Sequence, residues 1–185
     1  KLFEKIPYHV IVVLDDGYFQ FVEAPDYVRA LPYVVQGKNV IGLNSFSKAY
    51  GLAGMRIGYA YTTPGLAEYI QRLYKPFMIN RLSMEAAIAA LEDEDFLAKT
   101  VELLKKERQF LYRELDKLGI RYWKSQGNFI LIRPDMPETT FEASILKEGI
   151  MVRPVAGFGA AGCVRVTIGT HEANAAFVVG LKNVL

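Results

Sequence analysis

The sequence predicts an α/β fold on three observations. A run of mostly β-branched residues over 9–14, closed by Asp15, is typical of a buried parallel strand. Two more short apolar stretches, 39–43 and 57–61, flank a loop rich in small residues and read as further strands. Apolar residues then recur at helical spacing over 97–118 and stop at Gly119, which is typical of a long amphipathic helix with a glycine after its last turn.

Composition excludes several classes of function. Of the 185 residues, 51% are hydrophobic and 23% charged, which is ordinary for a globular protein, and a net charge of +2 gives no argument for nucleic-acid or membrane binding. No apolar run approaches the roughly 20 residues that span a bilayer. Cys163 is the only cysteine, which fits a reducing cytoplasm, and the two histidines, His9 and His171, are far apart. We therefore expect a cytoplasmic protein without a metal site.

The stretch 44–59 concentrates hydroxyls, one lysine, one arginine and several small residues. A phosphate-binding Walker loop would place a glycine where Ser47 stands and a hydroxyl where Ala49 stands, so that reading is rejected. Ser45 and Lys48 match the S-x-x-K motif of serine acyl transfer, but the S-D-N and K-T-G elements that should follow are missing. The remaining chemistry is a Schiff-base lysine that holds pyridoxal phosphate.

Two further positions carry chemistry. Asp15 follows the first strand, and ligands of open α/β sheets bind at the carboxyl ends of strands. Arg165 lies inside the strand-like segment V-R-V-T-I-G-T, where a planar guanidinium suits a carboxylate. Both positions therefore point to recognition of a small charged molecule.

The segment N-S-F-S-K-A-Y-G-L-A-G-M-R-I-G-Y resembles the lysine signature of fold-type I, class I/II, PLP-dependent aminotransferases, and especially of histidinol-phosphate aminotransferases. The resemblance implies pyridoxal 5'-phosphate as the cofactor. It implies that Lys48 binds this cofactor covalently and later moves a proton. Ser45, Ser47 and Arg56 are then expected to hold the cofactor phosphate.

Three other segments extend the resemblance along the chain. The element D-D-G-Y resembles the family's D-E-A-Y, which implies that Asp15 pairs with the cofactor's ring nitrogen and that Tyr18 donates a hydrogen bond to its ring hydroxyl oxygen. The last strand resembles the family's R-[IV]-[ST]-[IV]-G-T, so Arg165 is expected to bind the substrate α-carboxylate. Arg153, in M-V-R-P, is expected to reach the substrate's phosphate end.

The resemblance also implies a domain organisation. Residues 1–82 would be the last part of the large cofactor-binding domain, built on a mixed or parallel sheet. Residues 83–185 would form the interdomain helix and a small α+β domain. We expect the chain to be the C-terminal half of an enzyme about twice as long, active as a homodimer.

The implied activity is transfer of an amino group between a small-molecule donor and a keto acceptor, with histidinol phosphate and 2-oxoglutarate as the first choice. An aromatic amino-acid aminotransferase and a threonine-phosphate decarboxylase remain open, because they share the cofactor machinery. A non-catalytic fragment and the effector domain of a transcription regulator also remain open.

Local patterns predict the structure of three further segments. A short helical turn is expected over 27–31 and a short strand over 150–153. The charged residues 105–108 are expected to form a solvated helix face.

Overall fold

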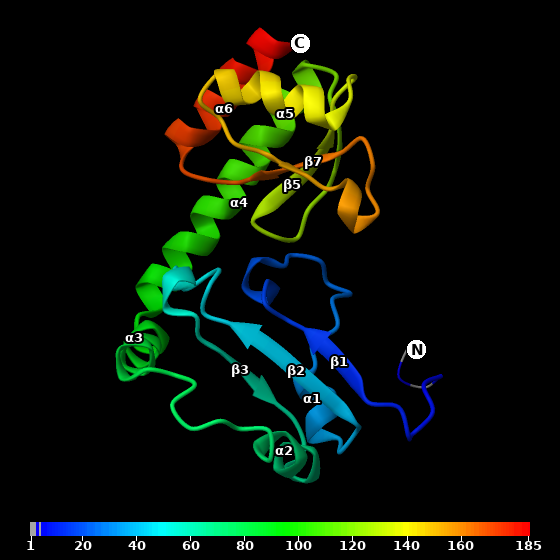
Figure 1. Cartoon of the computed structure of the whole chain (residues 1–185), viewed down its shortest axis with the longest axis vertical. Helices are drawn as coiled ribbons and strands as arrows, with labels where there is room; N and C mark the ends of the chain where they lie inside the picture. Colours follow the sequence, from blue (N-terminus) through cyan, green and yellow to red (C-terminus); the bar gives the residue numbers. More distant parts are fainter. Residues whose placement is uncertain (1–2, 4) are drawn as a thin grey trace. The chain divides into compact units, whose positions relative to one another are not determined.

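The computed structural model describes residue 3 and residues 5–185 (Figure 1). The chain consists of two compact units, residues 1–98 and residues 99–185, here called unit 1 and unit 2. The domain boundary expected between residues 82 and 83 stays a prediction.

Unit 1 contains a three-stranded sheet in the order β1-β2-β3. Strands β1 (Val12–Asp15) and β2 (Val40–Ser45) are parallel, with Asp15 opposite Leu43, and β3 (Gly58–Tyr61) runs antiparallel to β2. The sheet is therefore mixed, as expected. Because β1 and β2 are parallel, the residues that follow both strands lie at the same edge of the sheet.

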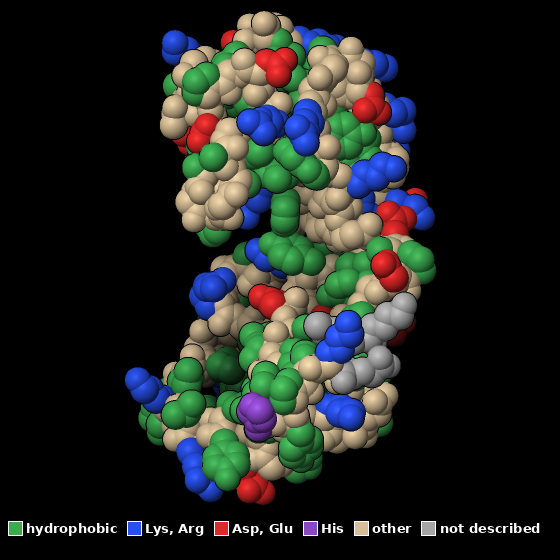
Figure 2. Space-filling view, turned by 90° about the vertical axis from the view of Figure 1, so that its right-hand side faces the viewer, with side chains coloured by type: hydrophobic (Ala, Val, Ile, Leu, Met, Phe, Trp, Pro, Cys, Tyr) green, Lys and Arg blue, Asp and Glu red, His purple; other side chains and the backbone are tan. Residues whose placement is uncertain are grey.

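The first strand is shorter and less buried than its sequence indicates. Only Val12–Asp15 pair in the ladder, and Val13 is 54% exposed. Val10 and Ile11 are exposed as well, and Figure 2 shows hydrophobic side chains on the surface of this unit. Among the described strands, β1 is the outer one of this sheet and pairs only with β2.

The helices of unit 1 begin at recognisable signals. Helix α2 (Pro64–Gln71) has proline in its first turn, and α3 (Arg81–Glu92) starts where the Asn80 side chain accepts a hydrogen bond from the Ser83 backbone at 2.8 Å. The expected helical turn at 27–31 is wrong. Helix α1 spans Leu31–Val35 instead, again with proline in its first turn. Two single 3-10 turns complete the unit, η1 (Phe19–Phe21) and η2 (Ala53–Met55).

Unit 2 contains an antiparallel sheet in the order β4-β5-β7-β6. Its helices are α5 (Glu138–Lys147), α6 (His171–Val184) and most of the long α4 (Glu94–Lys117), and it also has a short 3-10 turn, η3 (Ala156–Phe158). The strands are β4 (Arg121–Trp123), β5 (Phe129–Arg133), β6 (Arg153–Pro154) and β7 (Val164–Thr167). Of the strand expected over 150–153, only Arg153 lies in a strand, and β6 continues to Pro154.

A closed apolar core stabilises unit 2. Its fully buried side chains come from the sheet and from all three helices: Leu111, Leu115, Ile130, Ile132, Phe141, Ile145, Val164 and Leu181. Helix α4 ends at a turn in which Gly119 adopts a φ of +67°, the left-handed conformation expected after a helix terminus. In the described part of the chain, no helix is long and apolar enough to cross a membrane.

The expectation of a solvated charged face on α4 is wrong for two of its four residues. Glu107 is 1% and Arg108 2% exposed. The Glu107 carboxylate accepts a hydrogen bond from Asn174 at 2.9 Å and contacts Nδ1 of His171 at 3.2 Å, and Arg108 donates to the Ser125 carbonyl at 3.0 Å. Buried charges of this kind are tolerated because neighbouring polar groups replace water, and these partners come from distant parts of the sequence.

Candidate functional site

The candidate site lies where β1 and β2 end. The backbone of Asp16 donates to the Leu43 carbonyl at 2.8 Å, so the two strands remain joined up to their last residues. Asp15 is exposed just before this bond, and Ser45 ends β2 beside it. A side chain added at Gly17 would lie 3.9 Å from Cβ of Ser45, so the turn after β1 contacts the end of β2. Two of the predicted site residues thus share one edge of the sheet.

The lysine loop connects β2 to β3. It is anchored by two buried side chains, Phe46 and Ala49, and closed by backbone hydrogen bonds from Phe46 to the Ile57 carbonyl and from Leu52 to the Phe46 carbonyl. Within this frame the Gly51 backbone donates to the Lys48 carbonyl at 3.0 Å. The loop is therefore an ordered structure that presents Lys48 on its exposed side.

Glycine is required at the point where the loop joins β3. A Cβ at Gly58 would lie 2.6 Å from the Asn44 carbonyl oxygen, which is closer than atoms approach in proteins. The backbone of β3 can therefore pass close to the end of β2 only because residue 58 lacks a side chain. This approach fixes the distance between the two ends of the loop.

Two hydroxyls and a guanidinium lie together on this loop. The Ser45 hydroxyl accepts a hydrogen bond from the Ser47 backbone at 3.0 Å, and the Ser47 hydroxyl accepts one from Nη1 of Arg56 at 3.5 Å. Arg56 also donates to the Ala53 carbonyl and adopts a φ of +51°, which is uncommon for a residue with a side chain. The backbone strain at Arg56 thus accompanies an exposed cation held beside two hydroxyls, a combination suited to a phosphate.

Lys48 and Tyr18 are neighbours. The Lys48 ammonium lies 5.4 Å from the centre of the Tyr18 ring, and the Lys48 side chain is otherwise exposed. Asp15 accepts a hydrogen bond from the Gly17 backbone through Oδ1 at 3.0 Å, which orients its carboxylate. All six residues assigned to cofactor binding therefore come from one edge of the unit 1 sheet: Asp15, Tyr18, Ser45, Ser47, Lys48 and Arg56.

The two predicted substrate-binding arginines lie in unit 2, directly opposite each other on neighbouring strands. Arg153 of β6 pairs with Arg165 of β7 in antiparallel register, so their side chains leave the sheet on the same face. The Arg165 guanidinium lies 5.3 Å from the Phe129 ring centre, and the Arg153 guanidinium lies 5.0 Å from that of Phe158. Two like charges placed opposite each other repel, so an anion bound between them would be stabilising.

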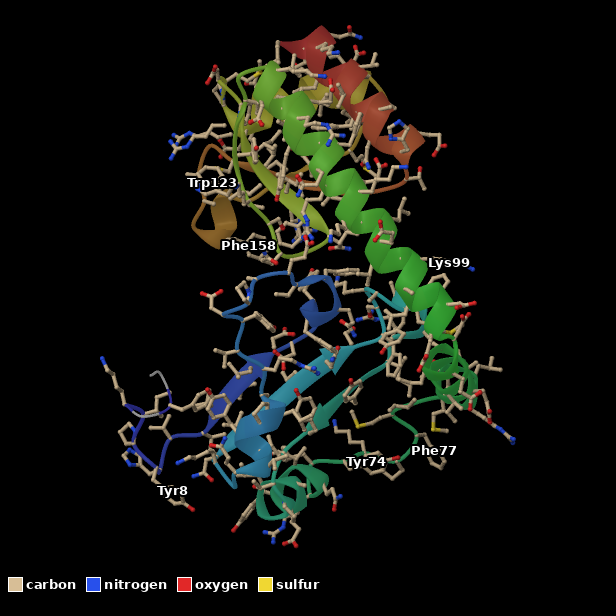
Figure 3. The ribbon with its side chains drawn as sticks, turned by 180° about the vertical axis from the view of Figure 1, so that it is seen from behind. Tyr8, Tyr74, Phe77, Lys99, Trp123 and Phe158 are labelled. Atoms are coloured by element: carbon tan, nitrogen blue, oxygen red, sulfur yellow. The ribbon has the colours of Figure 1, made fainter. Side chains whose placement is uncertain are left out.

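An apolar cavity of about 270 Å³ adjoins Arg165. It is lined by Phe129, Leu131, Val155, Phe158, Ala160 and Arg165. Phe158 lies on the short turn η3 at the margin of unit 2 (Figure 3). The site in unit 2 therefore combines cations with aromatic and aliphatic surface.

Sequence reasoning did not find the two aromatic residues of this site. Phe129 directly follows Asn128 in the sequence, and Phe158 stands in the glycine-rich segment 157–162. No periodic pattern marks either as a partner of an arginine. Their role depends on the pairing of β5 with β7 and of β6 with β7, which is a property of the sheet.

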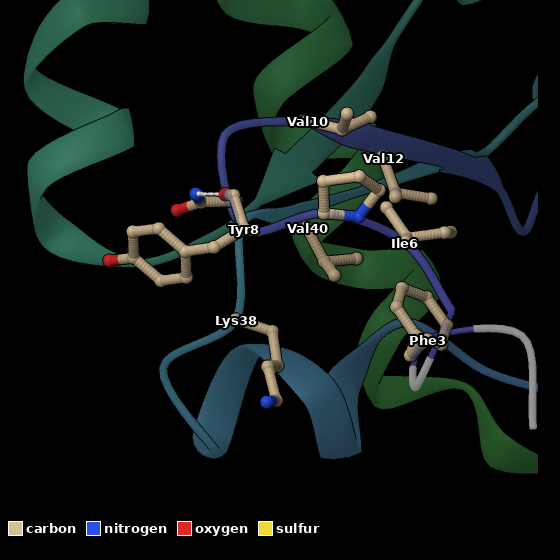
Figure 4. Close-up of a pocket in the computed structure, with 9 residues that line it drawn as sticks. Phe3, Ile6, Tyr8, Val10, Val12, Lys38 and Val40 are labelled. Carbon is tan, nitrogen blue, oxygen red and sulfur yellow. Dashed lines mark hydrogen bonds between the residues drawn. The ribbon is translucent and has the colours of Figure 1, made fainter.

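A separate cavity of about 230 Å³ lies at the opposite end of the unit 1 strands (Figure 4). Ile6, Val12 and Val40 contribute to its apolar wall, and the Tyr8 ring points away from that wall. It contains none of the predicted site residues. Among the described residues, no group of three or more His, Cys, Asp or Glu side chains is arranged to hold a metal ion.

Comparison with known proteins identifies the family. The family model described as aminotransferase class I and II matches residues 1–181. The chain belongs to the class I and II aminotransferase family. Among curated relatives, it is 39% identical over its whole length to histidinol-phosphate aminotransferase 2 of Carboxydothermus hydrogenoformans, and 41% identical over 98% of its length to histidinol-phosphate aminotransferase 2 of Hydrogenovibrio crunogenus. It covers 51% and 49% of those two proteins, so it spans about half the length of the curated relatives it matches.

Solved structures agree with this assignment. Histidinol-phosphate aminotransferase from Clostridium acetobutylicum superimposes with a TM-score of 0.86 at 27% identity, over 94% of this chain and 54% of that one. The enzyme from Sinorhizobium meliloti, solved in complex with pyridoxal-5'-phosphate, gives a TM-score of 0.84 at 29% identity, over 98% of this chain and 50% of that one. The architecture is thus part of the aminotransferase fold, as expected.

Proposed function

We propose that this chain supplies the lysine-bearing and substrate-recognising parts of a pyridoxal-phosphate-dependent aminotransferase that acts on histidinol phosphate and 2-oxoglutarate. The observation that carries the proposal is that Lys48, Tyr18, Asp15 and the Ser45–Ser47–Arg56 group lie at one edge of the unit 1 sheet. The curated relatives of 39% and 41% identity are both histidinol-phosphate aminotransferases.

The residues present suit pyridoxal 5'-phosphate. Two hydroxyls and a guanidinium form a donor set for a dianionic phosphate, and an exposed amine lies beside them at Lys48. The Asp15 carboxylate has Oδ1 bonded to its own turn and is exposed to a ligand. When bound, the cofactor supplies a ring that accepts the electrons of a substrate carbanion.

Each residue then has a defined task. The Lys48 amine would hold the cofactor and would afterwards accept and return a proton at Nζ. Asp15 would stabilise positive charge on the ring nitrogen, Tyr18 would donate to the ring hydroxyl oxygen, and Arg56 would hold the phosphate with the two serines.

The arginines of unit 2 recognise the substrate. Arg165 binds a carboxylate in bidentate fashion, as in 2-oxoglutarate and glutamate, and Arg153 binds the phosphate of histidinol phosphate. Arg153 and Arg165 lie opposite each other on β6 and β7, which supports these two roles. Anionic groups of one substrate, or of two substrates that bind in turn, would relieve the repulsion between the two arginines. We further propose that the intact enzyme is a cytoplasmic homodimer.

Cofactor attachment is tested directly on the purified chain. The chain is mixed with pyridoxal 5'-phosphate, reduced with borohydride and mapped by mass spectrometry. The expected result is a pyridoxyl group on Lys48, absent in Lys48→Ala and retained in the matched control Lys99→Ala, since Lys99 is an exposed lysine of α4. Labelling spread equally over surface lysines would contradict the assignment of Lys48.

Substrate identity is tested by steady-state rates in the enzyme that contains this chain. Histidinol phosphate is expected to be the best amino donor. Faster turnover with aromatic amino acids, or release of carbon dioxide from threonine phosphate, would replace the proposed substrate and leave the cofactor assignment standing.

A further inference from the structure

Two aspartates stand next to each other at the end of β1, and the structure separates them. Asp15 is exposed at the candidate site, whereas Asp16 is only 1% exposed. An exposed carboxylate can meet a ligand, whereas a buried one meets only its protein neighbours. The buried one has no part in the function proposed above.

Three hydrogen-bond donors surround the Asp16 carboxylate. Tyr27 donates its hydroxyl to Oδ1 at 2.9 Å, Tyr61 donates its hydroxyl to Oδ2 at 2.9 Å, and the Ala30 backbone donates to Oδ2 at 3.2 Å. An ionised carboxylate accepts hydrogen bonds only, so this set satisfies a buried charge. Burial first, and then the hydrogen bond to Asp16, raise the pKa of both tyrosines to about 12, which keeps both hydroxyls protonated as donors.

The position of Tyr61 depends on a glycine in the neighbouring strand. Gly42 of β2 is the register partner of Tyr61 in β3, and a Cβ at Gly42 would lie 2.3 Å from the Tyr61 ring. The ring therefore lies across the backbone of Gly42, and its hydroxyl reaches Asp16 beyond it. The central strand of the sheet is thus shaped to let Tyr61 contact Asp16.

The backbone of Asp16 is held as firmly as its side chain. Its N–H donates to the Leu43 carbonyl at 2.8 Å, and its carbonyl accepts from the Phe19 backbone at 3.0 Å. The second of these bonds closes the turn 16–19, which contains Tyr18 and directly follows Asp15. A movement of Asp16 would therefore displace both residues.

We propose that Asp16 is a positioning residue: bonded to Tyr27 and Tyr61, it holds the turn that aims Asp15 and Tyr18 at the cofactor. This inference rests on the proposed function and assigns the two aspartates different tasks. Asp15 contacts the cofactor ring, and Asp16 acts only through the turn.

The first test measures the turn itself, in the purified 185-residue chain. Amide hydrogen exchange at Phe19 and Phe21 is expected to become about tenfold faster in Asp16→Asn, because the new amide cannot accept from all three donors. The matched control Asp26→Asn removes an exposed carboxylate of the same segment and is expected to leave these rates unchanged. Unchanged rates in Asp16→Asn would overturn the inference.

The second test uses a signal that would stay unchanged in Asp16→Asn if Asp16 only stabilised the fold. The visible absorption of bound pyridoxal phosphate is titrated with pH in wild type, Asp16→Asn and Asp26→Asn. A shift of the titration midpoint of about one pH unit is expected in Asp16→Asn alone, although Asp16 does not contact the cofactor. A midpoint equal to that of wild type, together with faster exchange, would leave Asp16 with a structural role and overturn the inference.

The two proposals fail in different ways. If the wild type takes up no pyridoxal phosphate at Lys48, the proposed function fails, and the exchange rates decide whether Asp16 holds the turn. If Asp16→Asn does not fold, Tyr27→Phe and Tyr61→Phe each remove one donor and are expected to shift both signals in the same direction by a smaller amount. Tyr69→Phe, at an exposed tyrosine of α2, is the matched control and is expected to change neither signal.

Discussion

The sheets of the two units are stabilised in different ways. In unit 2, Ile130 and Ile132 of β5 and Phe141 of α5 are fully buried. In unit 1, apolar side chains of the β1 segment such as Val13 are exposed, and a charged side chain, Asp16, is among the most buried groups. Unit 2 is therefore stabilised mainly by apolar burial, whereas the candidate site of unit 1 depends on a few specific hydrogen bonds.

The difference matters for function. A densely packed sheet is a rigid support for the two arginines that β6 and β7 present. A turn held by hydrogen bonds to one carboxylate orients a site precisely, but it loses that orientation when a single donor or acceptor is removed. Variants in the core of unit 2 should therefore mainly lower stability, whereas variants at the turn of unit 1 should mainly change the orientation of the site.

The largest expected effect is a loss of stability when a side chain of the unit 2 core is removed. Phe141→Ala should lower the free energy of unfolding of unit 2 by about 3–5 kcal/mol, because it leaves a cavity at a fully buried position. Trp123 is the only tryptophan and lies in β4, so its fluorescence reports the unfolding of this unit. The comparison variant Val13→Ala in unit 1 should cost less than about 1 kcal/mol by hydrogen exchange, and equal costs would refute the contrast between the sheets.

The second-largest effect is expected at Glu107, a buried charged residue of unit 2. Glu107→Ala should cost about 1–3 kcal/mol, because it removes a hydrogen-bond acceptor of Asn174 and leaves space at a buried position. Glu102→Ala, at an exposed position of the same helix, should stay within about 0.5 kcal/mol of wild type. Denaturant titration of Trp123 fluorescence measures both, and a neutral Glu107→Ala would show that apolar packing alone decides the stability of this unit.

A smaller effect is expected at the start of α3 in unit 1. Asn80→Ala should cost about 1 kcal/mol, because the Asn80 side chain accepts the Ser83 backbone hydrogen bond that caps the helix. Asn80→Asp keeps the acceptor and should restore most of the stability. Amide exchange along 81–92 is the measurement, and identical protection in Asn80→Ala and wild type would show that the cap is not needed.

The smallest effect is an alkaline loss of stability in unit 1. The folded state raises the pKa of Tyr27 and Tyr61 from 10 to about 12, so it holds these two protons more tightly than the unfolded chain does. This contribution is fully present below pH 10 and is lost as pH rises from 10 towards 12. It should be modest because Tyr27 is 39% exposed and solvent screens its charge.

The alkaline prediction is measured by hydrogen exchange or thermal unfolding of unit 1 as a function of pH. Tyr27→Phe and Tyr61→Phe should each flatten the decline between pH 10 and 12 relative to wild type. A decline that persists unchanged in the double variant would show that other groups cause it.

Much of the local structure could be predicted because its causes are local. The strand at 39–43 and the glycine stop at Gly119 both follow from residues within a few positions of each other. The failures also have local causes: the helix expected at 27–31 begins instead at Leu31, followed by Pro32, because proline favours the first turn of a helix.

The sequence by itself determined the family, through the lysine segment, and it predicts that the chemistry depends on Asp15, Lys48 and Arg165. Only the tertiary structure decided which charged residues are buried. The sequence predicts Glu107 and Arg108 on a solvated face, because a charge is expected in water unless distant partners replace it, and it does not mark Asp16 as buried. Those partners, including Asn174 for Glu107 and Tyr61 for Asp16, are brought close by the packing of helices and the register of strands, which no short segment encodes.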